Sequence, residues 1–186
     1  MEDSPHVMLA GPGAEAFAQE QGFDPGSPEY FGTERRREAL RDRCVDGLRS
    51  CASVGEGAVW DDVEEVLWWV DIPVGLVYRF DPSTGENLPY SVGEPVGCLA
   101  LRASGGLVLA TQSGFCTFDP ETGACGKICD PEAHLPENRF NDGATDNNGR
   151  FWAGTMKIGG SPTPSGAFYR LDPDGSVTFW KGDIYT

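Results

Sequence analysis

Basic residues are scarce in this chain of 186 residues. Lys and Arg number 14 against 29 Asp and Glu, and the formal net charge is −15 at pH 7. A surface of this sign repels phosphate backbones and anionic lipid headgroups, which argues against a nucleic acid or a membrane as partner. The charge remains compatible with a cation or a neutral small molecule as ligand.

Histidine and long apolar runs are also lacking. His6 and His134 are the two histidines, and the motifs HExxH, GxSxG and the Walker loop are absent. Histidine-based catalysis is therefore not expected. No apolar run approaches the roughly 20 residues of a membrane helix, and the acidic start MEDSPHVMLAGPG lacks the features of a signal peptide. We expect a cytoplasmic protein whose six cysteines stay reduced.

Glycine, proline and aromatic residues are plentiful, which is typical of short strands joined by tight turns. The chain has 25 Gly, 14 Pro and 11% aromatic residues. After about residue 52, short runs rich in aromatic and β-branched residues alternate with turn sequences such as DPSTG, DPETG and DPDG. The sequence therefore predicts a mainly β fold for this part.

The β part consists of three similar units. Each has the order strand, turn, strand, loop, strand, Asp-Pro turn, strand, and Trp68, Val108 and Trp152 occupy equivalent places. Four strands per unit at a spacing of 40 and then 44 residues is typical of β-propeller blades, although an antiparallel sandwich also has short strands. The Asp residues that open the Asp-Pro turns are expected to bind their own backbone two residues on (Asp81, Asp119, Asp172).

The first 41 residues have a different character. The segments GAEAFAQEQGF and TERRREALR predict two helices, with Thr33 as an N-cap. We expect a short helical N-terminal extension, 1–41, ahead of a β region, 45–186.

Glu56 is one candidate for the site. It stands between two glycines just before the first predicted strand, where the inner strand of a blade starts at the central channel. A carboxylate there could bind a hard cation, and a solvated turn residue is the alternative.

The segment NRFNDGATDNNG provides the other candidates. Arg139, Asn141 and Asp142 come just before the predicted inner strand GATD, so they also face the channel. Asn supplies both donor and acceptor groups and Arg binds carboxylates or paired hydroxyls, which suits a polyhydroxylated substrate. Asn147 and Asn148 instead belong to the turn that follows, and its spacing does not fit a calcium-binding loop.

Residues from about 45 to 186 resemble the senescence marker protein/regucalcin/gluconolactonase family. The resemblance is carried by GEGAVWD (55–61), VDIP (70–73), RFNDG (139–143) and GRFWAGTM (149–156). It implies a six-bladed β-propeller, present here as an incomplete set of about three blades. It also implies hydrolysis of sugar lactones with a divalent metal as cofactor, which is calcium, zinc, magnesium or manganese in different members.

The resemblance assigns roles to particular residues. It implies that Glu56 is a metal ligand, that Arg139 and Asn141 line the substrate pocket, and that Asp142 lies beside them. Some members have an acidic residue at the position of Gly159, so one substrate contact differs. The general base and further metal ligands are expected beyond residue 186, so no catalytic residue is identifiable and hydrolysis is expected to be impaired or absent.

Residues 1–41 resemble a piece of the isoaspartyl peptidase/L-asparaginase α-subunit, carried by SPHVML, GAEAFA and TERR. That piece excludes the family's catalytic Thr, so it implies no asparaginase activity. Three hypotheses follow for the chain: a sugar-lactone hydrolase, a non-catalytic calcium- or ligand-binding module, or a non-functional hybrid of two gene fragments. Self-association through exposed blade edges is a further expectation.

Overall fold

The computed structural model describes residues 55–161 and 163–186. The chain divides into two units, Met1–Asp42 and Arg43–Thr186, and all described residues belong to the second. The helical extension predicted for residues 1–41 lies outside the described residues and stays a prediction. None of the described segments is a helix long and apolar enough to cross a membrane.

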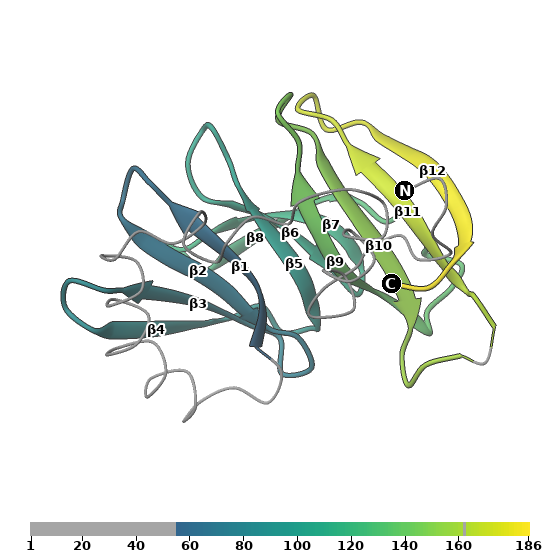
Figure 1. Ribbon diagram of the computed structural model, residues 1–186, viewed down its shortest axis with the longest axis horizontal. Coiled ribbons are helices and arrows are strands. Elements are labelled where there is room, and N and C mark those ends of the chain that lie inside the picture. The colour runs from purple at the N-terminus through teal and green to yellow at the C-terminus, as the bar shows by residue number, and fades with distance from the viewer. Residues whose placement is uncertain (1–54, 162) are drawn as a thin grey trace, which may run out of the picture. The chain divides into compact units, whose positions relative to one another are not determined.

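The described residues form twelve strands in three four-stranded antiparallel sheets (Figure 1). The first sheet, blade 1, contains β1 (Gly55–Asp61), β2 (Val66–Asp71), β3 (Leu76–Asp81) and β4 (Glu86–Ser91). Blade 2 contains β5 (Val96–Leu101), β6 (Leu107–Thr111), β7 (Gly114–Asp119) and β8 (Ala124–Cys129). Blade 3 contains β9 (Asn138–Thr145), β10 (Phe151–Lys157), β11 (Gly166–Leu171) and β12 (Val177–Ile184). Strands follow one another in sequence order within each sheet.

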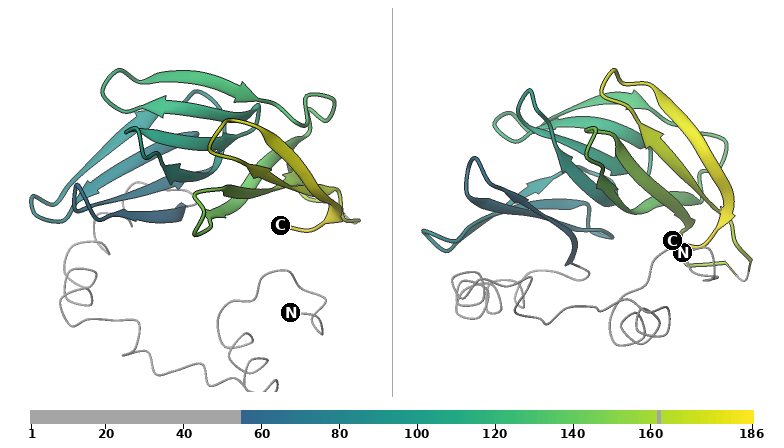
Figure 2. Two further views of the ribbon diagram at one scale, coloured as in Figure 1. Left: turned by 90° about the horizontal axis from the view of Figure 1, so that it is seen from above. Right: turned by 45° about the horizontal axis from the view of Figure 1, so that its top comes forward.

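The three sheets meet along their first strands. Strand β5 contacts β1 and β2 on one side, and β9 contacts β5 and β6 on the other, an order that can be followed in Figure 2. Trp68, Val108 and Trp152 lie at equivalent rungs, each on a second strand paired with a first strand. The prediction of a mainly β fold with three four-stranded blades is therefore confirmed.

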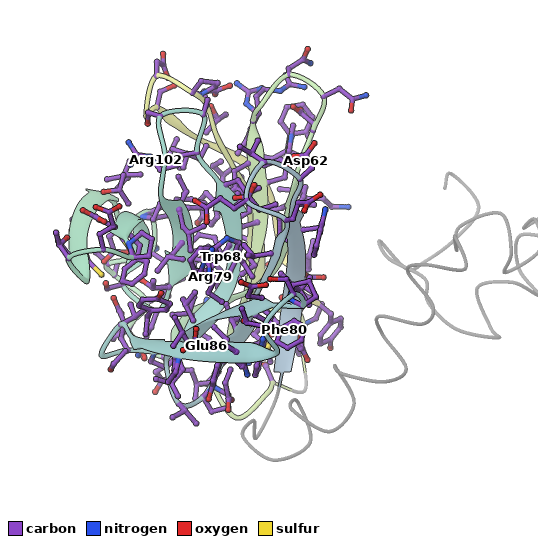
Figure 3. The ribbon with its side chains drawn as sticks, turned by 90° about the vertical axis from the view of Figure 1, so that its left-hand side faces the viewer. Asp62, Trp68, Arg79, Phe80, Glu86 and Arg102 are labelled. Atoms are coloured by element: carbon purple, nitrogen blue, oxygen red, sulfur yellow. The ribbon has the colours of Figure 1, made fainter. Side chains whose placement is uncertain are left out.

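The alternation of side chains along each strand builds two apolar cores between the blades, because successive residues point to opposite faces. Blade 1 packs on blade 2 through one cluster, which includes Val66, Trp68, Val70, Leu99, Leu107, Leu109 and Phe118. Blade 2 packs on blade 3 through another, which includes Cys98, Ala110, Phe115, Phe140, Phe151, Ala153 and Tyr169. Figure 3 shows blade 1, where Trp68 lies beside its cross-strand partner Arg79.

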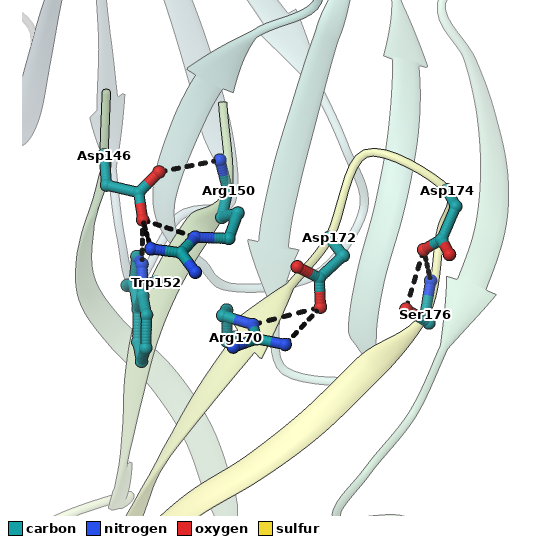
Figure 4. A network of polar contacts seen from close by, with 7 residues as sticks. All are labelled: Asp146, Arg150, Trp152, Arg170, Asp172, Asp174 and Ser176. Carbon is teal, nitrogen blue, oxygen red and sulfur yellow. Dashed lines mark hydrogen bonds and ion pairs between the residues drawn. The ribbon is translucent and has the colours of Figure 1, made fainter. Parts of the chain in front are cut away.

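Two of the three Asp-Pro turns have the predicted local hydrogen bond. The carboxylate of Asp81 accepts from the backbone N–H of Ser83 at 2.8 Å, and that of Asp119 accepts from Glu121 at 2.9 Å. The prediction is wrong for Asp172, whose Oδ2 accepts from Arg170 Nη2 at 2.8 Å instead (Figure 4). The third turn is one residue shorter, and Asp174 binds the backbone there.

The turn between β9 and β10 is organised by Asp146 rather than by the two Asn residues after it. Asp146 accepts from the backbone N–H groups of Asn148 and Arg150, from Arg150 Nε at 2.6 Å and from Trp152 Nε1 at 2.9 Å. These donors stabilise the ionised carboxylate and hold the pKa of Asp146 well below its usual range, with the Arg150 side chain as the largest cause.

Asp146→Asn is expected to lower the melting temperature at pH 7, because an amide has one acceptor oxygen to serve several donors. A carboxylate whose pKa is depressed on folding stabilises the protein above its unfolded pKa, which is about 4, and this stability is lost as the pH falls further. The melting temperature of the variant should therefore depend less on pH between about 4 and 2. Thermal unfolding followed by circular dichroism measures both effects.

The control is Asp62→Asn, at an exposed carboxylate that accepts no hydrogen bond from the described residues. An equal effect in the two variants would contradict the role of Asp146.

Candidate functional site

Each of the three first strands contains a β-bulge near the same end of its sheet. The pairing of β1 with β2 shifts between Glu56 and Val59, and that of β5 with β6 shifts around Gly97. In blade 3, Asn141 is the extra residue on β9, because Asp142 pairs with Gly154 and Phe140 with Thr155. Bulges redirect side chains and occur beside active sites. The three bulges therefore mark one end of the sheets as a candidate site.

Glycines allow these first strands to approach one another closely. A Cβ added to Gly97 would lie 2.4 Å from the carbonyl carbon and oxygen of Phe140 on β9. A Cβ at Gly57, which has a φ of +61°, would lie 3.6 Å from the Cα of Cys98. The backbone of β5 thus touches both β1 and β9, and it brings residues that are distant in sequence to one place.

Arg139, on β9, is the central cation of this end. Its Nη1 donates to the carbonyl oxygen of Phe140 at 2.8 Å and to Asn141 Oδ1 at 2.9 Å. Partial burial lowers its pKa, and the nearby carboxylate of Glu56 partly offsets this effect. Its other two guanidinium nitrogens donate to no described residue, so they can bind a ligand.

Glu56 lies on β1, pairs with Val70 and is exposed. Its negative charge raises the pKa of Arg139, which belongs to a different sheet, against the larger effect of burial. Glu56, Arg139, Asn141 and Asp142 were predicted to stand just before their strands, and this detail is wrong: all four lie within β1 or β9. The turn-like sequences around them are bulged strand rather than loop.

Asp142 lies at the rung equivalent to that of Glu56, since Val70 and Gly154 have equivalent places on the second strands. Its Oδ1 accepts from the N–H of Gly143 at 2.8 Å. Its charge also adds to the effect of burial in raising the pKa of the Cys98 thiol on β5. Cys98 is fully buried and therefore stays a protonated, unreactive thiol.

A buried carboxylate that the sequence did not reveal supports this end of blade 3. Glu132, in the loop before β9, is 8% exposed. It accepts hydrogen bonds from Asn138 Nδ2 at 3.0 Å, Thr155 Oγ1 at 2.9 Å and Tyr169 Oη at 3.0 Å. Burial and this carboxylate raise the pKa of Tyr169. Because the donors come from β9, β10 and β11, Glu132 joins the three strands directly beside Arg139.

Blade 2 has a hydrogen bond that corresponds to the one between Thr155 and Glu132 in blade 3. Thr111, at the place equivalent to Thr155, donates from Oγ1 to Glu94 Oε1 at 3.0 Å. Glu94 also accepts from the N–H and the hydroxyl of Ser113. The separations along the chain differ, with 17 residues between Glu94 and Thr111 and 23 between Glu132 and Thr155. No fixed spacing in the sequence could therefore have identified the pair.

This end of the sheets combines the exposed carboxylate of Glu56 with the guanidinium of Arg139 and the amide of Asn141. Hard divalent cations bind carboxylate and carbonyl oxygens, and they need six or more ligands. Within the described ranges, no group of three or more His, Cys, Asp and Glu side chains could hold a metal ion. Among the described residues Glu56 could therefore supply one ligand to such a cation but not a complete metal site.

A family profile and individual proteins of known sequence relate this chain to the same family. A sequence profile of the SMP-30/Gluconolactonase/LRE-like region matches residues 54–186. The chain is 41% identical over 143 residues to regucalcin of Xenopus laevis, which covers 75% of this chain and 47% of that protein. It is 33% identical over 142 residues to 6-deoxy-6-sulfogluconolactonase of Pseudomonas putida, covering 76% and 48%.

Solved structures show the same relationship. Regucalcin of Agrobacterium tumefaciens, described as a calcium-binding protein, superimposes with a TM-score of 0.67 at 27% identity. The match covers 72% of this chain and 44% of that one. The chain thus spans about half the length of the relatives it matches.

Proposed function

Because the chain belongs to the SMP-30/gluconolactonase/LRE-like family, we propose that residues 54–186 form the substrate-binding side of a metal-dependent sugar-lactone hydrolase site. The observation that carries this proposal is the placement of Glu56 on β1 and Arg139 on β9, the two first strands that flank β5. A lactone ring bears hydroxyls and a polarisable carbonyl, and this pair offers a cation and an anion to them.

Arg139 and Asn141 bind the substrate in this proposal. The hydrogen bonds from Arg139 Nη1 to Phe140 and Asn141 fix the plane of the guanidinium. Its remaining N–H groups can then donate to the ring hydroxyls, and a fixed side chain loses little entropy when it binds. The amide nitrogen of Asn141 donates beside it, while Asp142 lies next along the strand and accepts from hydroxyls.

Glu56 is the residue that would hold the metal. A divalent cation supplies Lewis acidity to the lactone carbonyl and lowers the pKa of a water molecule. The two glycines around Glu56 leave its carboxylate exposed. Calcium, zinc, magnesium and manganese are all candidates, because a carboxylate oxygen is a ligand for each.

Glu56→Gln is the direct test of this site. With D-glucono-1,5-lactone and each metal in turn, proton release above the spontaneous opening of the lactone should be weak, because the described residues supply a single metal ligand. The variant should return the rate to the spontaneous level, because the neutral amide loses the anionic ligand. A pH indicator measures proton release, and calorimetry measures metal binding, which should weaken at least about tenfold.

Glu86→Gln is the matched control, since Glu86 is an exposed carboxylate on β4 in the same blade. It should leave metal binding and lactone opening unchanged. A chain that binds no divalent metal, or one whose binding is equally affected in both variants, would remove the basis of the proposal.

A second candidate function is binding without turnover. The observation in its favour is that a full set of metal-ligating side chains is absent from the described ranges. In that case calorimetry would show metal binding that depends on Glu56, and the lactone would open at the spontaneous rate with every metal.

A further inference from the structure

Two free thiols on the outer strands of blade 2 differ in their exposure. Cys116 lies on β7 and Cys125 on β8, the last strand of that sheet. Cys116 is 8% exposed and belongs to the apolar core between blades 1 and 2, whereas Cys125 is exposed. Both faces of blade 2 pack on a neighbouring blade (Figure 2). The exposure of Cys125 is therefore that of a strand at the outer edge of a covered sheet.

The register of β7 and β8 places the two thiols on one face as diagonal neighbours. Phe118 pairs with Cys125, and Cys116 pairs with Lys127, two residues further along β8. Paired side chains share a face, and so do residues two apart on a strand. The mutual influence of the thiols agrees with this placement, because the pKa of Cys116 is raised to about 12, first by burial and then by the charge of Cys125.

Strand β8 can move to bring Cys125 closer to Cys116. A disulfide needs Cβ atoms about 3.5–4.5 Å apart, and diagonal neighbours in a regular pair are further apart than this. Within the described sheets β8 is an edge strand, and its pairing with β7 shifts between Phe115 and Cys116. An edge strand with an interrupted ladder opens locally more easily than a central strand. The bond is thus within reach but distorts the pair, and strained disulfides are readily reduced.

We propose that Cys125 and Cys116 form a reversible disulfide, in which Cys125 is oxidised first and Cys116 resolves it. With hydrogen peroxide as the oxidant, the sulfur of Cys125 attacks one peroxide oxygen and the O–O bond breaks. A sulfenic acid forms and the first water leaves. The sulfur of Cys116 then attacks the sulfur of Cys125, so that the S–S bond forms and the S–O bond breaks. The hydroxyl leaves with the proton of Cys116 as the second water, and the two electrons lost by the thiols reduce the peroxide.

The surroundings of Cys125 make the first step slow. The thiolate is the form that attacks the peroxide. Burial raises the pKa of Cys125, and the charge of Glu94 acts in the same direction. Little thiolate is therefore present at neutral pH, and we expect the disulfide to form under sustained excess of peroxide while the thiols stay reduced otherwise.

Hydrogen peroxide added to the reduced full chain tests the pair. After the remaining thiols are blocked with a maleimide, cleavage after Glu121 separates Cys116 from Cys125. Mass spectrometry should then find the two peptides linked, and dithiothreitol should separate them. A link from Cys125 to another cysteine would overturn the proposal, and so would the finding that both thiols stay reduced in excess peroxide.

Two serine variants assign the order of the steps. Cys116→Ser should abolish the link and leave Cys125 as a sulfenic acid, which dimedone traps. Cys125→Ser changes an exposed side chain, so the chain should fold as before, and Cys116 should stay reduced. Oxidation of Cys116 at the parent rate in this second variant would contradict the assignment of Cys125 as the first site.

Cys129→Ser is the matched control on the same strand. Cys129 pairs with Phe115, whose ring belongs to the core between blades 2 and 3. The shift in pairing between Phe115 and Cys116 puts Cys129 on the face opposite to that of Cys125. This variant should form the link as the parent chain does. Equal loss of the link in Cys129→Ser and Cys116→Ser would overturn the pairing, and none of these results depends on whether the chain opens a lactone.

Discussion

Glu132→Ala is expected to lower the free energy of unfolding by about 3–4 kcal/mol. The substitution leaves the Tyr169 hydroxyl without its acceptor. Asn138 Nδ2 and Thr155 Oγ1 also lose the carboxylate and keep only the carbonyl oxygens of Ser165 and Ala167. A buried donor without a partner loses the hydrogen bonds that it made to water in the unfolded chain. Urea unfolding followed by the fluorescence of the five tryptophans measures the change.

Glu137→Ala provides the control from the same loop. Glu137 is exposed and pairs with Lys157, so its loss should lower the free energy of unfolding far less than the loss of Glu132. Tyr169→Phe should cost about 1 kcal/mol in the parent protein and less in the Glu132→Ala background, because the hydroxyl then has no carboxylate to bind. Equal costs in both backgrounds would show that Tyr169 and Glu132 are not coupled.

Gly97→Ala is expected to cost about 3 kcal/mol or more, because it forces two first strands apart. The new methyl group would lie 2.4 Å from the carbonyl of Phe140 and 2.7 Å from the nitrogen of Asn141. Both contacts are to backbone, so no side-chain rotation relieves them. The same displacement would move Arg139 away from Glu56, and metal and lactone binding at the proposed site should weaken together with stability. Urea unfolding and calorimetry measure the two effects.

Gly182→Ala tests whether this cost is specific to the contact between strands. Gly182 also lies within a strand, and an added Cβ would meet only the ring of Phe179 at 3.3 Å, a side chain that is 60% exposed and can move. We expect a change within about 1 kcal/mol. If Gly97→Ala were equally mild, the close contact of β5 with β9 would not be needed to form the site.

The sequence by itself determined the repeat and the sheets. Alternation with a period of two residues identifies strands, and Gly, Pro and Asp identify the turns between them, because both effects act over a few residues. The equivalence of Trp68, Val108 and Trp152 could therefore be predicted and was confirmed. The motifs around Glu56 and Arg139 likewise identified candidate residues in β1 and β9, the two strands that flank β5.

Predictions from short stretches of sequence were wrong where a strand departs from regular pairing with its neighbour. The candidates were predicted to stand just before their strands, but they lie inside β1 and β9, at or beside a bulge. A bulge depends on the register of the neighbouring strand, which no window of a few residues contains. The same is true of Asp172, whose partner is Arg170 rather than the backbone of its own turn.

Only the tertiary structure decided which side chains meet. Glu56 and Arg139 come from different sheets on either side of β5, and Gly97 lets β5 touch β9. Glu132 looked like an ordinary acidic loop residue until three strands placed their donors around it. The physical reason is that strand formation depends on short-range preferences of the chain. The site depends on the stacking of sheets, which is a property of the whole fold.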